Sequence, residues 1–188
     1  MTEGRPLLIT GASGYLAGRL VPLACRRGAC VAVSRRRPDR STGATWSAAD
    51  LLDDSAVARL VDRWQPSAII NAAAANPGGS DGFDVNVVGA ANVARVAAAH
   101  GCRLVHVSSD IVHSGDDAPY RDAAPPSPIN DYGRSKAEGE AMVLAACPGA
   151  IVVRTSLIYG LDEIDRGTAG FAARLESDGA LALWDDAL

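Results

Sequence analysis

The chain has 188 residues, of which 48% are hydrophobic and 21% charged, as expected for about one globular domain rather than a disordered chain. A formal net charge of −4 argues against nucleic-acid binding, and no segment reaches the roughly 18 apolar residues of a membrane span. The four cysteines have no metal-ligand spacing and the N-terminus does not resemble a signal peptide, so we expect reduced thiols, no metal and a cytoplasmic protein.

Short apolar runs alternate with longer segments of helical periodicity. In chain order, this pattern predicts a strand at 6–10, a helix at 15–27, a strand at 31–33, a polar stretch at 34–42, a helix from Asp53 or Asp54 to Trp64, a strand at 68–71, a helix at 85–100, a strand at 104–108, a helix at 132–146 and a strand at 151–154. A loop-like segment at 162–170 then precedes a short helix at 171–175. Alternating strands and helices predict an α/β fold with a doubly wound parallel sheet of the Rossmann type.

A glycine-containing turn lies directly between the first strand and the first helix, in the segment 10–18. Gly11 and Gly14 permit a tight turn, and they let backbone N–H groups approach a pyrophosphate at the start of the helix. Such a pattern also occurs in ordinary strand–helix turns. Its position after the first strand of an alternating series favours dinucleotide binding.

The end of the second strand indicates which dinucleotide is preferred. NAD-binding proteins place an acidic residue about 20 positions beyond the glycines, whereas this chain has Ser34, Arg35, Arg36 and Arg37 there. Because guanidinium groups pair with phosphate, Arg35 and Arg36 favour NADP(H), with NAD(H) as the second option. A solvated basic loop is the alternative interpretation.

Tyr132 and Lys136 lie four residues apart and therefore share one face of the predicted helix. A nearby cation favours the phenolate, so we expect Lys136 to bring the pKa of Tyr132 toward neutrality. Lys136 is the single lysine of the chain, which otherwise uses arginine, and this makes a chance pairing less plausible. Ser108 and Ser109 stand at the carboxyl end of a strand, where a hydroxyl faces the ligand crevice of a parallel sheet or caps a turn.

Several collinear motifs between residues 7 and 160 together resemble a known family. They are Thr10-Gly11-Ala12-Ser13-Gly14, Asn71-Ala72-Ala73-Ala74, Val85-Asn86 with Gly89 and Asn92, Ser108-Ser109-Asp110, the segment 128–140, and 153–160. The chain resembles the extended short-chain dehydrogenases/reductases of the NAD-dependent epimerase/dehydratase group. Within that group it most resembles the dTDP-4-dehydrorhamnose reductase family.

The resemblance implies hydride transfer from NADPH to a keto group of a nucleotide-linked sugar. Ser109 would polarise the carbonyl, Tyr132 would protonate its oxygen, and Lys136 would complete this catalytic triad and contact the nicotinamide ribose. The remaining cofactor contacts implied are Gly11, Ser13, Gly14, Tyr15 and Leu16 at the pyrophosphate, Asp50 and Leu51 at the adenine, and Ala72, Ala73 and Ala74 beneath the cofactor.

The segment after Ser109 departs from the pattern of the family. The usual Thr-Asp-Tyr-Val-Phe is replaced by residues 109–113, ending in His113, which leaves the sugar undetermined. His113 is interpreted as a loop histidine in preference to a substrate contact. Ile111 stands where the dehydratases of the family carry glutamate, which argues against dehydration.

Family members also carry a second lobe that binds the sugar nucleotide, and most of that lobe is absent from this sequence. We therefore expect a dinucleotide-binding domain at 1–160 and the start of a truncated substrate-binding lobe at 161–188, with a homodimer left open. Two alternatives remain: a sugar-nucleotide epimerase, which would prefer tightly bound NAD, and a non-catalytic NADP-binding regulatory subunit.

Overall fold

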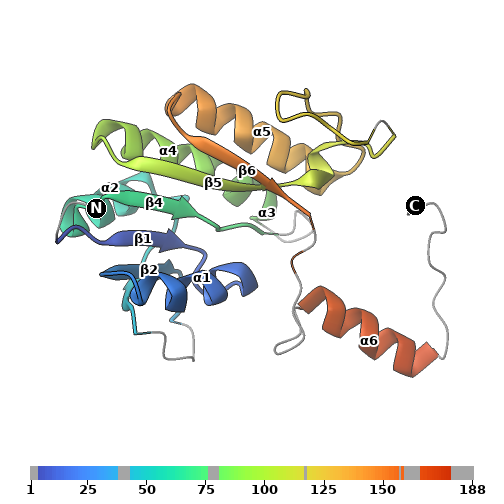
Figure 1. Cartoon of the computed structure of the whole chain (residues 1–188), viewed down its shortest axis with the longest axis horizontal. Coiled ribbons are helices and arrows are strands. Elements are labelled where there is room, and N and C mark those ends of the chain that lie inside the picture. Colours follow the sequence, from blue (N-terminus) through green and yellow to red (C-terminus); the bar gives the residue numbers. More distant parts are fainter. Residues whose placement is uncertain are drawn as a thin grey trace. The chain divides into compact units, whose positions relative to one another are not determined.

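The computed structural model describes residues 4–37, 43–75, 81–116, 118–156, 158 and 166–178. The chain forms two compact units, Met1–Ser156 and Leu157–Leu188. The first unit holds the sheet and most of the helices (Figure 1).

Six parallel strands form one sheet in the order β3-β2-β1-β4-β5-β6. The strands are β1 (Leu7–Thr10), β2 (Cys30–Ser34), β3 (Thr45–Ala48), β4 (Ala68–Asn71), β5 (Arg103–Ser109) and β6 (Ile151–Thr155). The helices of this unit are α1 (Tyr15–Cys25), α2 (Asp54–Trp64), α3 (Gly82–Asp84), the π-helical turn η1 (Val85–Gly89), α4 (Ala90–Ala99), the 3₁₀ turn η2 (Asp110–Val112) and α5 (Asp131–Ala146). The predicted Rossmann-type fold is confirmed.

The two faces of the sheet pack against different helices. On one face, Leu8, Val31, Ile69 and Leu104 form a core with residues of α2, α4 and α5. On the other face, Ile9 and Ala32 pack with Ala17 and Val21 of α1. Burial on both faces explains why the central strands are apolar throughout.

Capping residues fix where two of the helices begin. The Asp53 side chain accepts a hydrogen bond from the Ala56 N–H and caps α2, which confirms one of the two predicted starts. Asn130 caps α5 in the same way through the Gly133 N–H, at 2.8 Å, so this helix begins one residue before Tyr132.

Three local features differ from the predictions. The polar stretch is followed by strand β3, which the sequence did not indicate because this edge strand is only partly buried and lacks an apolar run. The helix predicted at 85–100 is divided into the π-helical turn η1 and α4. In the second unit, α6 (Arg166–Asp178) is longer than the helix predicted at 171–175 and includes 166–170, which was predicted as loop, whereas 162–165 lie outside the described residues.

Candidate active site

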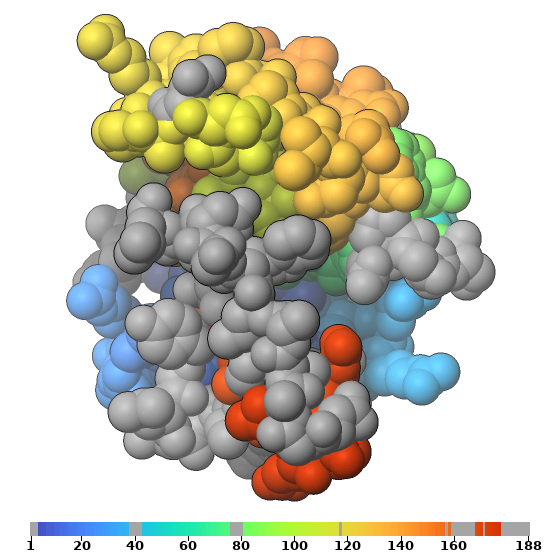
Figure 2. All heavy atoms as spheres, turned by 90° about the vertical axis from the view of Figure 1, so that its right-hand side faces the viewer, coloured from blue at the N-terminus to red at the C-terminus, as the bar shows by residue number. Residues whose placement is uncertain are grey.

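The carboxyl ends of β1 and β4 mark the point where the order of the strands reverses. The chain leaves β1 toward β2 on one side, whereas β4 is followed by β5 on the other. Ligands of open parallel sheets bind at such a point, outside the carboxyl ends of the strands. Figure 2 looks onto this edge, and the segment after β5 and the start of α5 lie along its upper side (yellow to orange).

The glycine turn packs directly against the segment that follows β4. Gly11 has a φ of +71°, and a Cβ at this position would lie 2.7 Å from both the Ala72 carbonyl oxygen and the Ala73 nitrogen. Only glycine fits there. Gly14 then donates to the Gly11 carbonyl at 2.8 Å and stands at the N-cap of α1, where it has no side chain to cover the first N–H groups of the helix.

The structure thus brings the predicted pyrophosphate-binding segment and the predicted alanines together at one edge. Ser13 is exposed, and Tyr15 and Leu16 are half-buried in the first turn of α1. Ala72 and Ala73 are also half-buried, and Ala74 is exposed. This surface of glycine, alanine and free helix N-terminus has the composition expected for close approach of a dinucleotide.

The turn after β2 presents its arginines at the same edge. The Ser34 hydroxyl donates to the Arg36 carbonyl at 2.6 Å and accepts from the Trp46 indole N–H at 3.1 Å, which fixes the turn. The Arg35 guanidinium lies 3.6 Å from the Asp81 carboxylate, and both side chains are about half exposed. Arg36 is exposed as well.

The predicted adenine segment, Asp50 and Leu51, follows β3. Asp50 is exposed and its carboxylate accepts the Leu52 N–H at 3.1 Å, so it shapes its own turn. Leu51 is buried, and its carbonyl accepts from the Asn92 side chain on α4 at 2.9 Å.

Ser109, Tyr132 and Lys136 lie on β5 and on helix α5, which packs against it. Ser109 is the last residue of the strand, and its hydroxyl donates to the Asp110 carboxylate at 3.2 Å and accepts the Ile111 N–H at 3.3 Å. Lys136 is 1% exposed, and its Nζ donates to the Val107 carbonyl of β5 at 2.8 Å. Tyr132, one turn earlier on α5, is half-buried.

The electrostatics of this group differ from the prediction. Burial lowers the pKa of Lys136 to about 8, and the Glu140 carboxylate only partly opposes this shift. Burial raises the pKa of Tyr132, and the Asp110 carboxylate raises it further, so the predicted lowering of the phenol's pKa is wrong in this structure. Both burial and the nearby Asp110 carboxylate disfavour the charged phenolate, and the Lys136 amine donates to the Val107 carbonyl. Tyr132 therefore holds its proton at neutral pH.

Asn86, which the sequence marks only as part of a family motif, links two segments beside the candidate site. The residue lies in η1 and is 1% exposed, and its side chain accepts the Ala75 N–H and donates both to the Ala75 carbonyl and to the Ser135 hydroxyl. It thereby joins the segment after β4 to α5. A polar residue inside a predicted alanine- and valine-rich helix was the available signal, since buried amides require partners.

His113 is a loop histidine in this structure. It is buried, its ring stacks on Tyr120 with centroids 4.0 Å apart, and its Nε2 accepts from the Arg154 guanidinium at 3.1 Å. Arg154 also donates to both carboxylate oxygens of Glu140, at 2.7–3.2 Å. This geometry favours the loop interpretation over a substrate contact.

In the described ranges, no group of three or more histidine, cysteine or acidic side chains is arranged to hold a metal ion. Within the same ranges, no helix combines the length and apolarity that a membrane crossing needs.

Comparison with known proteins places this geometry in a family. Residues 5–186 match the RmlD substrate binding domain. The chain belongs to this family. It is 36% identical over 174 residues to methionine adenosyltransferase 2 subunit beta of Bos taurus, covering 86% of this chain and 49% of the relative. It is 38% identical over 161 residues to the dTDP-4-keto-6-deoxy-D-glucose reductase of Streptomyces niveus, covering 81% of this chain and 52% of the relative.

A solved structure of a dTDP-4-sugar reductase has a similar fold. The dTDP-4-dehydrorhamnose reductase of Bacillus anthracis in complex with NADP is 27% identical, with a TM-score of 0.67, over 93% of this chain and 60% of that one. This member of the RmlD substrate binding domain family thus spans about half the length of the curated relatives it matches.

Proposed function

We propose that this chain binds NADP(H) at the carboxyl edge of its sheet and serves in the reduction of a keto group on a nucleotide-linked sugar. The observation that carries the proposal is the position of Lys136. Its buried amine lies under the end of β5, one helical turn from Tyr132 and on the same sheet edge as the glycine turn. Residues 161–188 would begin the lobe that binds the sugar nucleotide.

The preference for NADP(H) rests on the turn after β2. Arg35 and Arg36 place two exposed guanidinium groups at the end of β2, where they can bind a 2′-phosphate. The strand β2 itself has no acidic side chain of the kind that binds the ribose hydroxyls in NAD-binding proteins. The Arg35–Asp81 ion pair is exposed and long, so a 2′-phosphate can displace the carboxylate at little cost. The Bacillus anthracis relative is described in complex with NADP, which supports the same choice.

Ser109, Tyr132 and Lys136 each have one role in the proposed reaction. When bound, the reduced nicotinamide supplies a hydride to the carbonyl carbon. The Ser109 hydroxyl donates a hydrogen bond to the carbonyl oxygen, and the phenol of Tyr132, which keeps its proton at neutral pH, transfers that proton to the oxygen. The amine of Lys136 holds the phenol and the ribose in place.

A second function is supported by a separate observation. Several relatives, at 33–38% identity, are named as subunit beta of methionine adenosyltransferase 2. A chain of this kind would bind NADP(H) as a non-catalytic regulatory subunit. It would bind the cofactor and a methionine adenosyltransferase, and it would reduce no sugar.

The deciding experiment is a reduction assay on a dTDP-4-keto-6-deoxy sugar, followed by nicotinamide absorbance. We expect the unmodified chain to reduce the sugar, and Tyr132→Phe to lose about 100-fold or more of that rate while its NADPH affinity stays unchanged. Tyr120→Phe, which changes a phenol on the loop after η2, is the matched control and should keep the rate. NADPH binding without reduction, together with stable binding of the unmodified chain to a purified methionine adenosyltransferase, would instead support the regulatory subunit.

A further inference from the structure

A row of buried polar side chains crosses three neighbouring strands. Thr10, Asn71 and His106 are register partners on β1, β4 and β5, and each is at most 1% exposed. Two residues before each of them in its strand stands a core residue that packs with α4 and α5: Leu8, Ile69 and Leu104. Because side chains two residues apart on a strand point to the same face, the row lies on the face of the sheet that α4 and α5 cover.

The hydrogen bonds in this row determine which nitrogen of His106 carries the proton. The Thr10 hydroxyl donates to Asn71 Oδ1 at 2.6 Å, so the Asn71 amide nitrogen faces His106, with its Nδ2 3.1 Å from His106 Nδ1. Nδ1 is therefore the acceptor. The neutral ring must carry its hydrogen on Nε2, and burial together with the charge of Lys136 lowers the pKa of His106 to about 3.

Two polar side-chain atoms of β5 on this face have no partner among the described residues. They are His106 Nε2 and Ser108 Oγ, which are buried and two residues apart on β5. Between them, the Val107 carbonyl receives the Lys136 ammonium. A buried donor without a partner costs about 1–3 kcal/mol, and a water molecule is retained inside a protein where two to four polar groups converge.

We propose that His106, Ser108 and Lys136 bind one buried water molecule, and that His106 is a positioning residue that acts through this water on the Lys136 amine. The Nε2–H of His106 donates to the water, the water donates to Ser108, and its remaining lone pair faces Lys136. Thr10 and Asn71 fix the ring so that this donor points at the water. The use of Lys136 in carbonyl reduction rests on the proposed function, but the water site itself does not.

The other ionisable groups around Lys136 act from different positions. Glu140 lies one turn later on α5 and has its carboxylate neutralised by Arg154 of β6. Tyr132 lies one turn earlier on α5, and Asp110 of η2 acts on Tyr132. Variants of His106 and Ser108 leave all four of these side chains in place.

The test uses the fact that Lys136 is the only lysine. Protein labelled with ¹³C-lysine gives a single lysine signal, whose pH titration reports Lys136 alone. His106→Asn keeps an acceptor for Asn71 but removes the Nε2–H donor, so the water can accept more strongly from the ammonium. We expect the Lys136 pKa to rise by about one unit, a tenfold change in its protonation constant.

Two further variants separate positioning from packing. His106→Gln retains an N–H near the Nε2 position and should leave the titration close to that of the unmodified protein. Ser108→Ala removes the acceptor for the water and should lower the Lys136 pKa. Val105→Thr, on the opposite face of β5, is the matched control and should change nothing.

The proposal is overturned if His106→Asn and Ser108→Ala both titrate like the unmodified protein, or if ¹⁵N spectra show the His106 proton on Nδ1. Should His106→Asn fail to fold, Ser108→Ala and the ¹⁵N measurement on the unmodified protein decide. NADPH titration of the same samples tests the proposed function separately, because the Lys136 signal is read without cofactor or sugar.

Discussion

Lys136 is a charged side chain that lies in a buried environment. A lysine is rarely fully buried, yet this side chain is 1% exposed and has its pKa lowered to about 8. Its hydrogen bond to the Val107 carbonyl and the neighbouring Glu140 carboxylate compensate only in part. Such a group weakens the fold, and positions of this kind are characteristic of functional sites.

This burial makes the stability of the protein depend on pH in a defined window. Between pH 8 and 10.5, the unfolded chain still binds the lysine proton, whereas the folded protein has released it. Below pH 8 both states are protonated, and the buried ammonium destabilises the fold to its full extent. This destabilisation is lost as the pH rises from 8 to 10.5. We expect Lys136→Met to be more stable than the unmodified protein at pH 7, by up to roughly 3 kcal/mol. The difference in the free energy of unfolding between the two proteins, measured by urea unfolding, should shrink as the pH approaches 10.5. A difference that does not change with pH would contradict this prediction.

Helix α5 approaches its neighbours most closely at two glycines. A Cβ on Gly133 would lie 2.3 Å from the Ile111 carbonyl oxygen, and a Cβ on Gly139 would lie 2.3 Å from the Asn86 carbonyl oxygen. The close approach brings Tyr132 next to η2 and Lys136 under β5. The position of the candidate active site therefore depends on backbone contact along this helix.

Gly139→Ala tests this contact. In an exposed helix the change would stabilise by about 1 kcal/mol, but here the methyl group must displace the backbone of η1, which costs about 1–3 kcal/mol or more. We expect a net loss of stability in urea unfolding. Gly149→Ala, at a position with open space, is the control and should be near neutral. Gly139→Ala as stable as the control would show that the two elements are not in tight contact.

These contacts also explain which elements could be predicted from the sequence. The apolar runs of β1, β2 and β4 and the apolar stripe of α2 have strong periodicity, and they were predicted within about two residues. The strand β3 is an edge strand without such a run, and the π-helical turn around Asn86 depends on Ser135 and Ala75, which are distant in sequence. The predicted roles of Ser109, Tyr132 and Lys136 rest on residue spacing and on motif resemblance. The pKa of Tyr132 depends on burial and on Asp110, which the local sequence pattern did not indicate.

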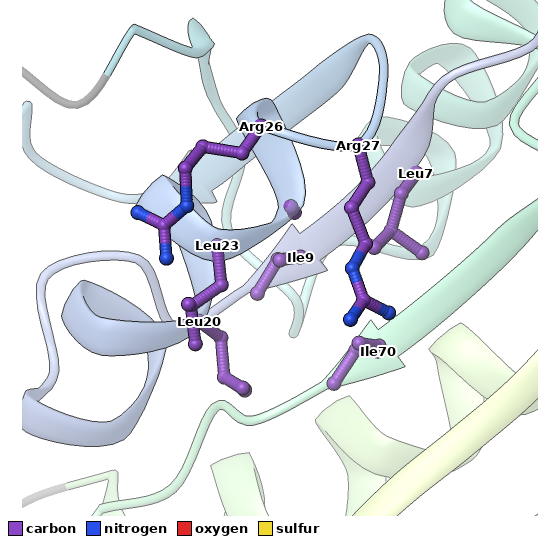
Figure 3. Close-up of a pocket in the computed structure, with 8 residues that line it drawn as sticks. Leu7, Ile9, Leu20, Leu23, Arg26, Arg27 and Ile70 are labelled. Carbon is purple, nitrogen blue, oxygen red and sulfur yellow. The ribbon is translucent and has the colours of Figure 1, made fainter.

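Across the whole first unit, the helices cover the two sheet faces unequally. On the face that carries α1, Ile70, Val105, Val107, Ile151 and Val153 form an apolar strip across β4, β5 and β6, and Ile151 at the edge is 61% exposed. The strip adjoins a cavity of about 400 Å³ between α1 and the sheet, lined by Leu7, Ile9, Leu20, Leu23, Ala24, Ile70, Arg26 and Arg27 (Figure 3). This cavity lies at the amino end of β1, away from the candidate active site.

An exposed apolar strip beside β6, an edge strand of the sheet among the described residues, favours association between copies of the chain. We expect the protein to self-associate as its concentration rises, and Ile151→Thr with Val153→Thr to reduce this without loss of NADPH binding. Sedimentation velocity over a concentration series measures the degree of association of the unmodified protein and of this variant. Met142→Thr with Leu144→Thr, which changes exposed apolar residues of α5, is the control. A monomer at every concentration would refute the role assigned to the strip.

The central claim for the whole molecule is that its sheet edge is a binding site for NADP(H). Calorimetric titration of NADPH and NADH into the unmodified chain tests it most directly, with Arg35→Ala/Arg36→Ala as the altered site and Arg26→Ala/Arg27→Ala, at the far end of α1, as the control. We expect NADPH to bind about tenfold or more tightly than NADH, a difference of about 1.4 kcal/mol that the first pair removes and the second keeps. Equal affinities in the unmodified chain, or no binding of either nucleotide, would contradict the account.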